Sequence, residues 1–400
     1  MSLLTAAERF ASIDRSEINF DPGRCLYTKG KSAACRACFD LCPVAAITPG
    51  KPPRFEAGRC QACLACLPVC PTGAFGADDS VPALFNAASH VEGEALELLC
   101  EHNPQPERGL AAETTGIMVR HCLGGLGMGA YVALAAFGLK RIYVRTEHCA
   151  GCSWSVLGAS VEAQARQANQ FLSAWDKPAF VECLVASDDS VARTFWSAEN
   201  PPVSRREMFR MLARRSKTIM ARAIENGQSR QAGQPGRDRL RLLGALANLP
   251  LAEARMDTDL VGLGFASLSV SDACSACATC ARVCPTGALS YDRDAQGAHF
   301  SLHFAASNCV ACGLCAHACI PSAIDLDYAP SFSQVFSEPV VTVFEASLVK
   351  CSRCGAATRA RPGFDLCPVC EFRRQNPFGS MLPQDMAARM ASPYSKERVS

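Results

Sequence analysis

The cysteines of this 400-residue chain constrain its fold more than any other feature: there are 25, and most recur at fixed short spacings. The pattern C-x2-C-x2-C-x3-C occurs in full three times, with a proline close behind each copy. The copies are Cys60, Cys63, Cys66 and Cys70; Cys274, Cys277, Cys280 and Cys284; and Cys309, Cys312, Cys315 and Cys319. Thiolates at this spacing wrap three corners of an iron–sulfur cube, and the fourth crosses to a neighbouring cube. The pattern therefore predicts pairs of [4Fe-4S] clusters.

A fourth copy of the pattern is altered. Cys35, Cys38 and Cys42 are in register, but Ser32 stands at the position of the first ligand, and Cys25 lies seven residues further upstream. We interpret the intervening sequence LYTKGKSAA as part of an enlarged loop that returns Cys25 to the same iron. The alternative is a [3Fe-4S] cluster that lacks this ligand.

These motifs, at residues 20–78 and 270–328, resemble those of bacterial dicluster ferredoxins. The resemblance implies two modules with four [4Fe-4S] clusters, each completed by a cysteine of the neighbouring motif. The implied ligand sets are Cys25, Cys35 and Cys38 with Cys70; Cys60, Cys63 and Cys66 with Cys42; Cys274, Cys277 and Cys280 with Cys319; and Cys309, Cys312 and Cys315 with Cys284. Zinc is the alternative metal, but zinc sites use two separated cysteine pairs and need no third and fourth cysteine at these spacings.

Composition sets the surroundings of these motifs. Hydrophobic residues make up 49% of the chain and charged residues 20%, as in ordinary globular proteins. The net charge is +2, so no broad basic surface indicates a nucleic-acid partner. The first residues carry no secretory signal, and the longest apolar stretch, 124–139, is too short to span a membrane. We expect a cytoplasmic protein without a transmembrane segment, in which spaced cysteines bind metal and do not form disulfides.

The middle of the chain predicts an α/β domain over residues 90–190. Helical patterns at 128–138 and 158–175 alternate with short apolar runs at Ala95–Cys100, Ile117–Cys122, Arg141–Thr146 and Ala179–Val185. Such alternation predicts a flavodoxin-like parallel sheet with helices on its faces. Cys183 lies alone on the last of these runs and is expected in the core.

Four further cysteines stand at or after the ends of these strands: Cys100, Cys122, Cys149 and Cys152. Because ligands collect at the carboxyl ends of parallel strands, we expect the four to converge on one site. The stretch from Arg120 to Cys152 resembles the delta (iron–sulfur) subunit of methyl-viologen-reducing hydrogenases and heterodisulfide reductases, which implies a [2Fe-2S] cluster. Four thiols without metal are the alternative, and His121 or His148 could replace a ligand.

Glycines at 124, 125, 127 and 129 follow the second of these cysteines. They superficially suggest phosphate binding, but they match no complete nucleotide-binding fingerprint. We therefore predict no nucleotide from them.

Near the other end of the chain, two C-x2-C pairs are separated by 12 residues: Cys351 and Cys354, then Cys367 and Cys370. Two such pairs complete a tetrahedral site of four sulfurs, so the pattern predicts a zinc-ribbon-like element over residues 340–375. A rubredoxin-like iron would use the same geometry.

The remaining segments set the expected domain boundaries. A basic amphipathic helix is predicted at 205–224, within a helix-and-linker region at 200–250 whose sequence GQSRQAGQPGRDR lacks apolar periodicity. Dicluster ferredoxin modules are expected at 20–80 and 265–330, and a polar tail at 376–400. The predicted fold is a multidomain one that combines α+β modules with a central α/β domain.

The sequence has many complete cluster motifs and no convincing substrate site. This combination predicts an electron-transfer subunit that relays electrons between a donor and a larger oxidoreductase. By resemblance, its partner is a hydrogenase, a formate dehydrogenase or a heterodisulfide-reductase-like complex. Two alternatives stay open. One is a reductase with a catalytic cluster in the middle domain, and the other is a redox-sensing scaffold, although the sequence has no DNA-binding motif.

Overall fold

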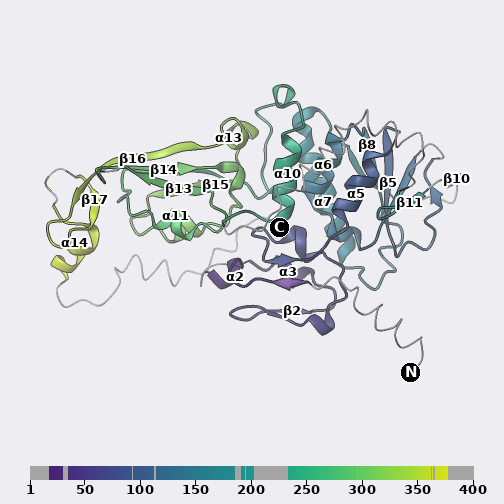
Figure 1. Cartoon of the computed structure of the whole chain (residues 1–400), viewed down its shortest axis with the longest axis horizontal. Coiled ribbons are helices and arrows are strands. Elements are labelled where there is room, and N and C mark those ends of the chain that lie inside the picture. The colour runs from purple at the N-terminus through teal and green to yellow at the C-terminus, as the bar shows by residue number, and fades with distance from the viewer. Residues whose placement is uncertain are drawn as a thin grey trace. The chain divides into compact units, whose positions relative to one another are not determined.

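The computed structural model describes residues 18–29, 35–91, 93–111, 114–184, 191–193, 195–201, 233–294, 296–361, 363 and 365–376. The basic helix expected at 205–224 and the tail after residue 376 lie outside these residues. Contacts divide the chain into two compact units, shown in Figure 1. Unit 1 comprises residues 1–28, 36–230 and 236–255, and unit 2 comprises residues 29–35, 231–235 and 256–400. Within the described ranges, no helix is long and apolar enough to cross a membrane.

Unit 1 begins with short elements that carry the first two cysteine motifs. β1 pairs antiparallel with β4, and β2 pairs antiparallel with β3, so the first and last strands enclose an inner hairpin. Ile18, Ile47, Leu64, Leu67 and Phe75 form the small core beneath them. The elements are β1 (Asn19–Phe20), α2 (Leu26–Lys29), α3 (Ala37–Leu41), β2 (Ile47–Thr48), β3 (Arg54–Phe55), η1 (Ala57–Arg59), α4 (Cys66–Val69) and β4 (Phe75–Gly76).

The rest of unit 1 is built on a five-stranded parallel sheet in the order β11-β7-β5-β8-β9. The strands are β5 (Ala95–Cys100), β7 (Thr115–Val119), β8 (Arg141–Arg145), β9 (Val181–Leu184) and β11 (Phe195–Ser197). The predicted parallel sheet is confirmed. In chain order its first four strands stand 2-1-3-4, as in flavodoxin-like folds, but the fifth adds beside the second instead of the fourth. This fifth strand is three residues long and was missed by the sequence patterns.

Helices pack around this sheet (Figure 1). All residues of α6 except Ala136 are buried, because α6 packs against α5, α7 and α10. A helix that is apolar on every side is expected in such a position. The remaining elements of unit 1 are α5 (Val81–Ser89), β6 (Arg108–Gly109), η2 (Leu123–Gly125), α6 (Met128–Ala136), α7 (Leu157–Leu172), η3 (Ser173–Trp175), β10 (Val191–Ala192), α10 (Arg237–Leu246) and η4 (Leu251–Glu253).

Helix α10 contacts both the cysteine-rich part of unit 1, through α4, and the sheet domain, through α6. Its first turn is the end of the sequence expected as a linker. The buried carboxylate of Asp238 accepts hydrogen bonds from the backbone N–H groups of Gly129, at 2.8 Å, and Ala130, at 3.2 Å. These groups lie at the N-terminus of α6, where a negative charge is stabilised. On the other side, Arg241 donates two hydrogen bonds to buried Asp79, at 2.8 and 2.9 Å.

Two arginines and a glutamate are buried in the sheet. Glu97 of β5 is fully buried and lies 3.0 Å from Arg145 of β8 and 3.0 Å from Arg193. A Cβ on Gly116 of β7 would overlap the guanidinium of Arg193, so glycine at this position makes room for the charge. The network lies just below the carboxyl ends of β5 and β8 and holds these two strand ends together.

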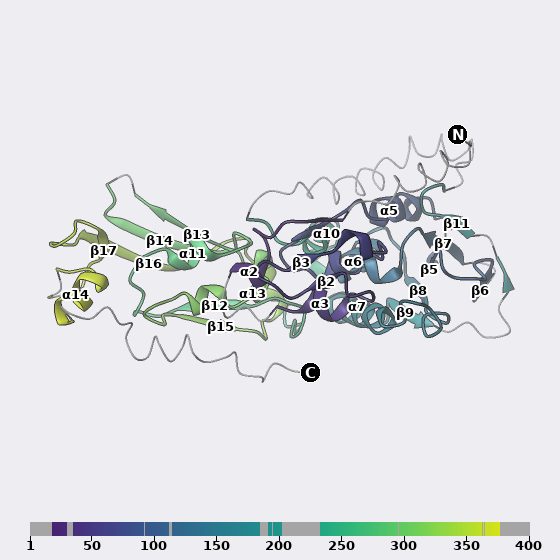
Figure 2. The ribbon, with the colours of Figure 1, turned by 90° about the horizontal axis from the view of Figure 1, so that it is seen from below.

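Unit 2 repeats the strand order of the first elements of unit 1. β12 pairs antiparallel with β15, and β13 pairs antiparallel with β14 between them. The β13–β14 hairpin is extended by β16 and β17 into a sheet of its own, in the order β13-β14-β16-β17, as Figure 2 shows. The elements are β12 (Ser267–Val270), α11 (Thr279–Val283), β13 (Leu289–Arg293), β14 (His299–Phe304), η5 (Ala306–Asn308), α12 (Leu314–His317), β15 (Ile324–Asp327), α13 (Phe332–Phe336), β16 (Val341–Lys350), β17 (Ala357–Arg359) and α14 (Pro368–Gln375).

Candidate functional site

The three complete cysteine motifs share an uncommon backbone conformation around the second cysteine. Ala62 and Leu64, on either side of Cys63, have φ angles of 52° and 62°. The same two positions are left-handed in the other complete copies: Ala276 at 56° and Ala278 at 58°, then Ala311 at 51° and Gly313 at 72°. Left-handed conformations are rare outside glycine and cost roughly 1–2 kcal/mol per residue. Their recurrence at equivalent positions indicates a loop held in shape for its sulfur atoms.

All four motifs share a second left-handed turn, three residues after the last cysteine. The residues concerned are Ala45 at 48°, Gly73 at 62°, Gly287 at 64° and Ser322 at 54°. In three motifs the next backbone N–H then donates a hydrogen bond to the cysteine Sγ: Ala46 to Cys42 at 3.3 Å, Ala74 to Cys70 at 3.1 Å, and Ala323 to Cys319 at 3.2 Å. Hydrogen bonds to the sulfurs tune iron–sulfur clusters. The altered first motif therefore keeps the geometry of the complete ones at its last cysteine.

Thiols of neighbouring motifs lie close together in both units, and the assignment of each thiol to a cluster stays a prediction. In unit 2, Cys274, Cys277 and Cys280 line one cavity together with Cys319 of the next motif. Burial raises the pKa of the Cys315 thiol, and nearby Cys309, Cys312 and Cys284 raise it further. In unit 1, burial likewise raises the pKa of the Cys63 thiol, and Cys42 and Cys60 add to the rise. Buried thiols of this kind lose their protons when a metal binds.

Cys25, the ligand expected from the enlarged loop, lies just before α2. The ring of Tyr27 in α2 packs edge-on against Phe39 of α3, with 5.3 Å between the ring centroids. This contact places the start of the loop beside the helix that contains Cys38. Residues 30–34 lie outside the described residues, and the ligation of Cys25 and Cys35 stays a prediction.

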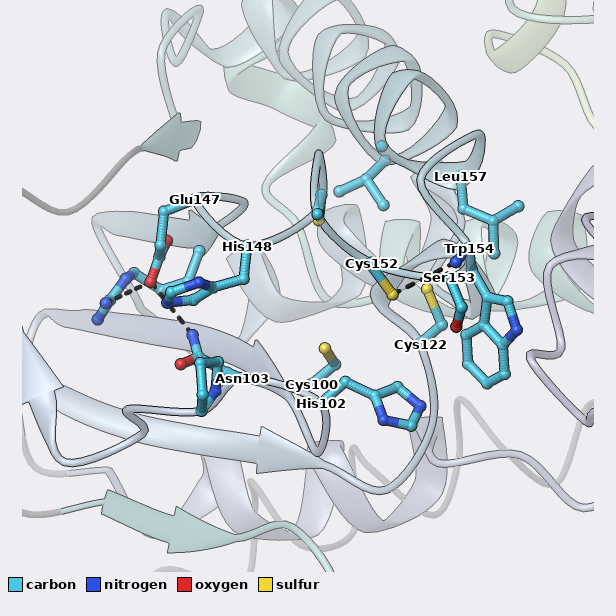
Figure 3. A pocket seen from close by; sticks show the side chains of 16 residues that line it. Cys100, His102, Asn103, Cys122, Glu147, His148, Cys152, Ser153, Trp154 and Leu157 are labelled. Atoms are coloured by element: carbon cyan, nitrogen blue, oxygen red, sulfur yellow. Dashed lines mark hydrogen bonds and ion pairs between the residues drawn. The ribbon is translucent and has the colours of Figure 1, made fainter.

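In the sheet domain, Cys100, Cys122, Cys149 and Cys152 line one cavity of about 460 Å³. Figure 3 shows the sulfurs of Cys100, Cys122 and Cys152 directed toward one another. The cavity lies at the carboxyl ends of β5 and β8, where the strand order reverses and where open α/β sheets bind ligands. Burial raises the pKa of Cys122 to about 12 and that of Cys149 to about 11. The four cysteines therefore lie around one cavity at the switch point of the sheet, and their binding of a metal stays a prediction.

The cavity has the local geometry of a cluster site. The backbone N–H two residues after Cys122, and that two residues after Cys152, each donate to the cysteine Sγ at 3.4 Å. Ala62 makes the same bond to Cys60, at 3.4 Å, in a complete ferredoxin motif. The donor set, four half-buried thiols around one cavity with N–H groups aimed at sulfur, fits an iron–sulfur cluster. His148 lines the cavity, whereas Nδ1 of His121 pairs with the Ser80 hydroxyl at 2.7 Å.

One wall of this cavity is polar, and the sequence patterns missed it. Glu147 pairs with Arg145 and accepts a hydrogen bond from Asn103 at 3.1 Å, while its other carboxylate oxygen is buried without a hydrogen-bond partner. Trp154 completes the opposite side (Figure 3). Glu147 stands two residues after β8, so the rule that ligands gather at strand ends could have found it.

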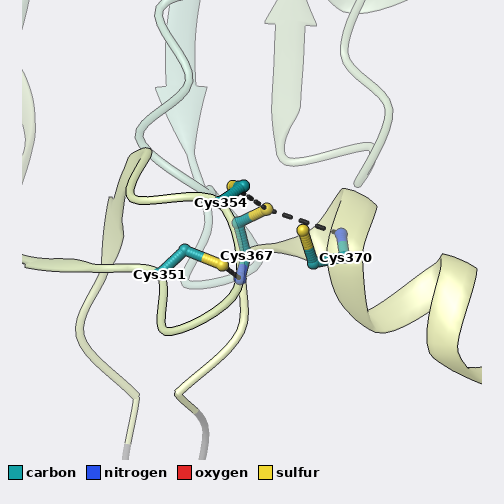
Figure 4. Close-up of side chains that lie close together, drawn as sticks. All are labelled: Cys351, Cys354, Cys367 and Cys370. Atoms are coloured by element: carbon teal, nitrogen blue, oxygen red, sulfur yellow. Dashed lines mark hydrogen bonds between the residues drawn. The ribbon is translucent and has the colours of Figure 1, made fainter.

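The last four cysteines form a compact set in unit 2, shown in Figure 4. The Sγ atoms of Cys351, Cys354, Cys367 and Cys370 all lie within 4.8 Å of one another. Four sulfurs bound to zinc at about 2.3 Å would stand about 3.8 Å apart. Cys354 and Cys367 have their Sγ atoms at 3.8 Å. The N–H of Cys367 donates to Cys351 Sγ at 3.3 Å and lowers the pKa of that thiol to about 6, so the set fits a mononuclear metal ion.

All 25 cysteines lie among the described residues, and each is a free thiol. Comparison with curated proteins gives no match to the chain. A protein-family model described as a 4Fe-4S dicluster domain matches residues 273–324, which hold the second and third complete sets of cysteines. Unit 2 therefore contains a ferredoxin-type 4Fe-4S dicluster domain.

Proposed function

We propose that the chain is a multi-cluster electron-transfer subunit. It carries four [4Fe-4S] clusters in two dicluster modules, a further cluster in the sheet domain and one zinc ion at the last four cysteines. The observation that carries the proposal is the shared turn after the last cysteine of all four motifs, at Ala45, Gly73, Gly287 and Ser322. A turn that orients sulfur at both ends of the chain supports the same cofactor at both ends.

In this role the protein relays electrons between a donor and a larger oxidoreductase complex in the cytoplasm. The cluster sites use cysteines from two motifs each, so they stand close together and pass electrons without a moving part. The cavity in the sheet domain is the counterpart of the cluster site of the delta subunit family, and its cluster is of the [2Fe-2S] type. The partner is a hydrogenase, formate dehydrogenase or heterodisulfide-reductase-like complex.

The test is to measure iron, acid-labile sulfide and zinc per chain after anaerobic purification, together with EPR spectra of the reduced protein. About 18 irons with one zinc, and a [2Fe-2S] signal beside [4Fe-4S] signals, are expected. About 8 irons would limit clusters to the dicluster domain of unit 2 and overturn the proposal.

A reductase is the second candidate, because the cavity offers more than thiols. Asn103, Glu147 and His148 line this cavity of about 460 Å³, so a small polar substrate could bind beside the cluster. This function requires turnover by the isolated, reduced protein with a small-molecule acceptor, and Glu147→Gln should then raise the KM. Failure of every acceptor to reoxidise the protein would exclude it.

A further inference from the structure

The second cysteine loop of unit 1 lies directly against the turn that closes the four-cysteine cavity. A Cβ on Gly125 would stand 3.2 Å from the Cβ of Leu64 and 3.5 Å from the carbonyl oxygen of Cys63. A Cβ on Gly124 would stand 3.6 Å from the Cβ of Ala65. Because glycine has no Cβ, the turn approaches the loop at Gly125 by a few tenths of an ångström more closely than another residue would allow, while the contact at Gly124 has ordinary van der Waals spacing. These glycines thus serve a contact and not a phosphate.

A hydrogen bond joins the same two regions. The indole Nε1 of Trp154 donates to Oε1 of Gln61, at 2.6 Å. The backbone N–H of Trp154 donates in turn to Sγ of Cys152, as Figure 3 shows. One residue is therefore bonded both to the cysteine loop and to a thiol of the cavity.

Water is excluded from the centre of this contact. Leu64 and Ala65 are each only 1% exposed, and both glycines are buried. A ligand cysteine adjoins each side of the contact, because Cys63 directly precedes Leu64 and Cys122 stands two residues before Gly124. The two cysteine sites are thus separated by packed protein atoms only.

From this geometry we infer that the contact of Gln61, Leu64 and Ala65 with Gly124, Gly125 and Trp154 is the route by which electrons pass between the N-terminal cysteine module and the cavity of the sheet domain. The inference rests on the proposed function. When the clusters are bound, one electron leaves the cluster at Cys60, Cys63 and Cys66 and arrives at the one in the cavity, with no bond made or broken. The electron originates from a low-potential one-electron donor. The protein's part is to hold the loop of Cys63 against the turn that follows Cys122.

The test compares variants of the contact with matched controls in the anaerobically purified full chain. Gly125→Leu pushes the turn away from Leu64, and Trp154→Phe removes the indole N–H but keeps an aromatic ring. Gly58→Leu is the glycine control, because a Cβ there has open space around it. Trp175→Phe is the tryptophan control, because its Nε1 donates elsewhere, to the carbonyl of Pro250 at 3.0 Å.

Two readouts are used after reduction with dithionite: the spin–spin broadening between the two sites by EPR, and the arrival of the electron in the cavity by freeze-quench EPR. We expect both contact variants to keep their iron, to lose the broadening and to show severalfold slower arrival, while both controls match the wild type. If Gly125→Leu loses iron, its rate cannot be compared with that of the wild type, and the inference is then judged on Trp154→Phe alone. Wild-type spectra and rates in the iron-loaded contact variants would overturn the inference.

A further variant separates this failure from a failure of the proposed function. Cys122→Ala should lose the iron and the EPR signal of the cavity. If it retains the iron content and spectrum of the wild type, the cavity holds no cluster, and the proposed function and the inference fall together. If it loses them while the contact variants behave as the wild type, only the inference falls.

Discussion

The cysteine-rich parts of the two units share their loops but differ in what surrounds them. In both, the first strand pairs with the last around an inner hairpin, and the same loop positions are left-handed. In unit 1 each hairpin strand is two residues long, whereas in unit 2 the hairpin pairs five residues and extends through β16 and β17 to the last four cysteines. The cysteine loops therefore have the same conformation in both units. The strands differ in length, and only in unit 2 does the hairpin continue into a larger sheet.

The two cysteine-rich parts also differ in how closely their sequences follow the dicluster ferredoxin pattern. The family match covers residues 273–324, where all eight cysteines are in register. The first motif of the chain has Ser32 at a ligand position and a loop of extra residues before Cys35. Its remaining geometry still follows the pattern, because Ala45 adopts the same left-handed turn as Gly73.

Removal of equivalent ligands from the two modules should have the largest effect. Cys66 and Cys280 are both 9% exposed and occupy the same motif position. We expect Cys66→Ala and Cys280→Ala each to lose at least one and up to about four irons per chain, because each removes one ligand of a cube. Iron and sulfide analysis measures this. An unchanged iron content in Cys66→Ala alone would show that the N-terminal module binds no cluster at that site.

A second comparison concerns stability. Asp79 in unit 1 is buried between Arg237 and Arg241, whereas the side chain of Asp272 in unit 2 is 97% exposed beside Arg359. Asp79→Ala leaves a buried cation unpaired and should lower the free energy of unfolding by about 3–5 kcal/mol. Asp272→Ala should change it by less than about 1 kcal/mol.

Urea unfolding checks this prediction. All three tryptophans lie in unit 1, so their fluorescence follows that unit, while circular dichroism follows both. Equal midpoints for the two variants would contradict the predicted difference between a buried and an exposed ion pair.

A smaller effect is expected at the zinc-ribbon-like set of unit 2, which consists of Cys351, Cys354, Cys367 and Cys370. Cys354→Ser should lose one zinc per chain and no iron, because the Sγ atoms of this set are spaced for a single ion. Elemental analysis after anaerobic purification measures both metals. Loss of iron with no zinc in the wild type would instead identify a rubredoxin-like centre.

The smallest change tests the altered motif. If Cys25 completes the cube, Cys25→Ala should lose about one iron and gain the EPR signal of an oxidised [3Fe-4S] cluster, which the oxidised wild type lacks. Ser32→Cys in the Cys25→Ala background restores the regular spacing and should remove the signal. A wild type that already shows this signal, and that Ser32→Cys alone silences, would favour the three-iron alternative.

Much of the site follows from short-range patterns. The cysteine spacings and the strand–helix alternation anticipated the dicluster domain and the parallel sheet, because both depend on backbone geometry over a few residues. Cys100, Cys122 and Cys152 could be expected together, since each follows a strand of one sheet. The fifth strand and the polar wall at Glu147 lack such a pattern and were missed.

What the sequence determined by itself was which residues could bind metal, because ligand type and spacing are local properties. Which of these sites lie next to each other depends on the packing of the whole chain. The glycines after Cys122 are explained by Leu64 on one side and by Asp238, 109 residues from Gly129, on the other. Contacts between residues so far apart depend on how whole helices and loops pack, and no short window of sequence contains that information.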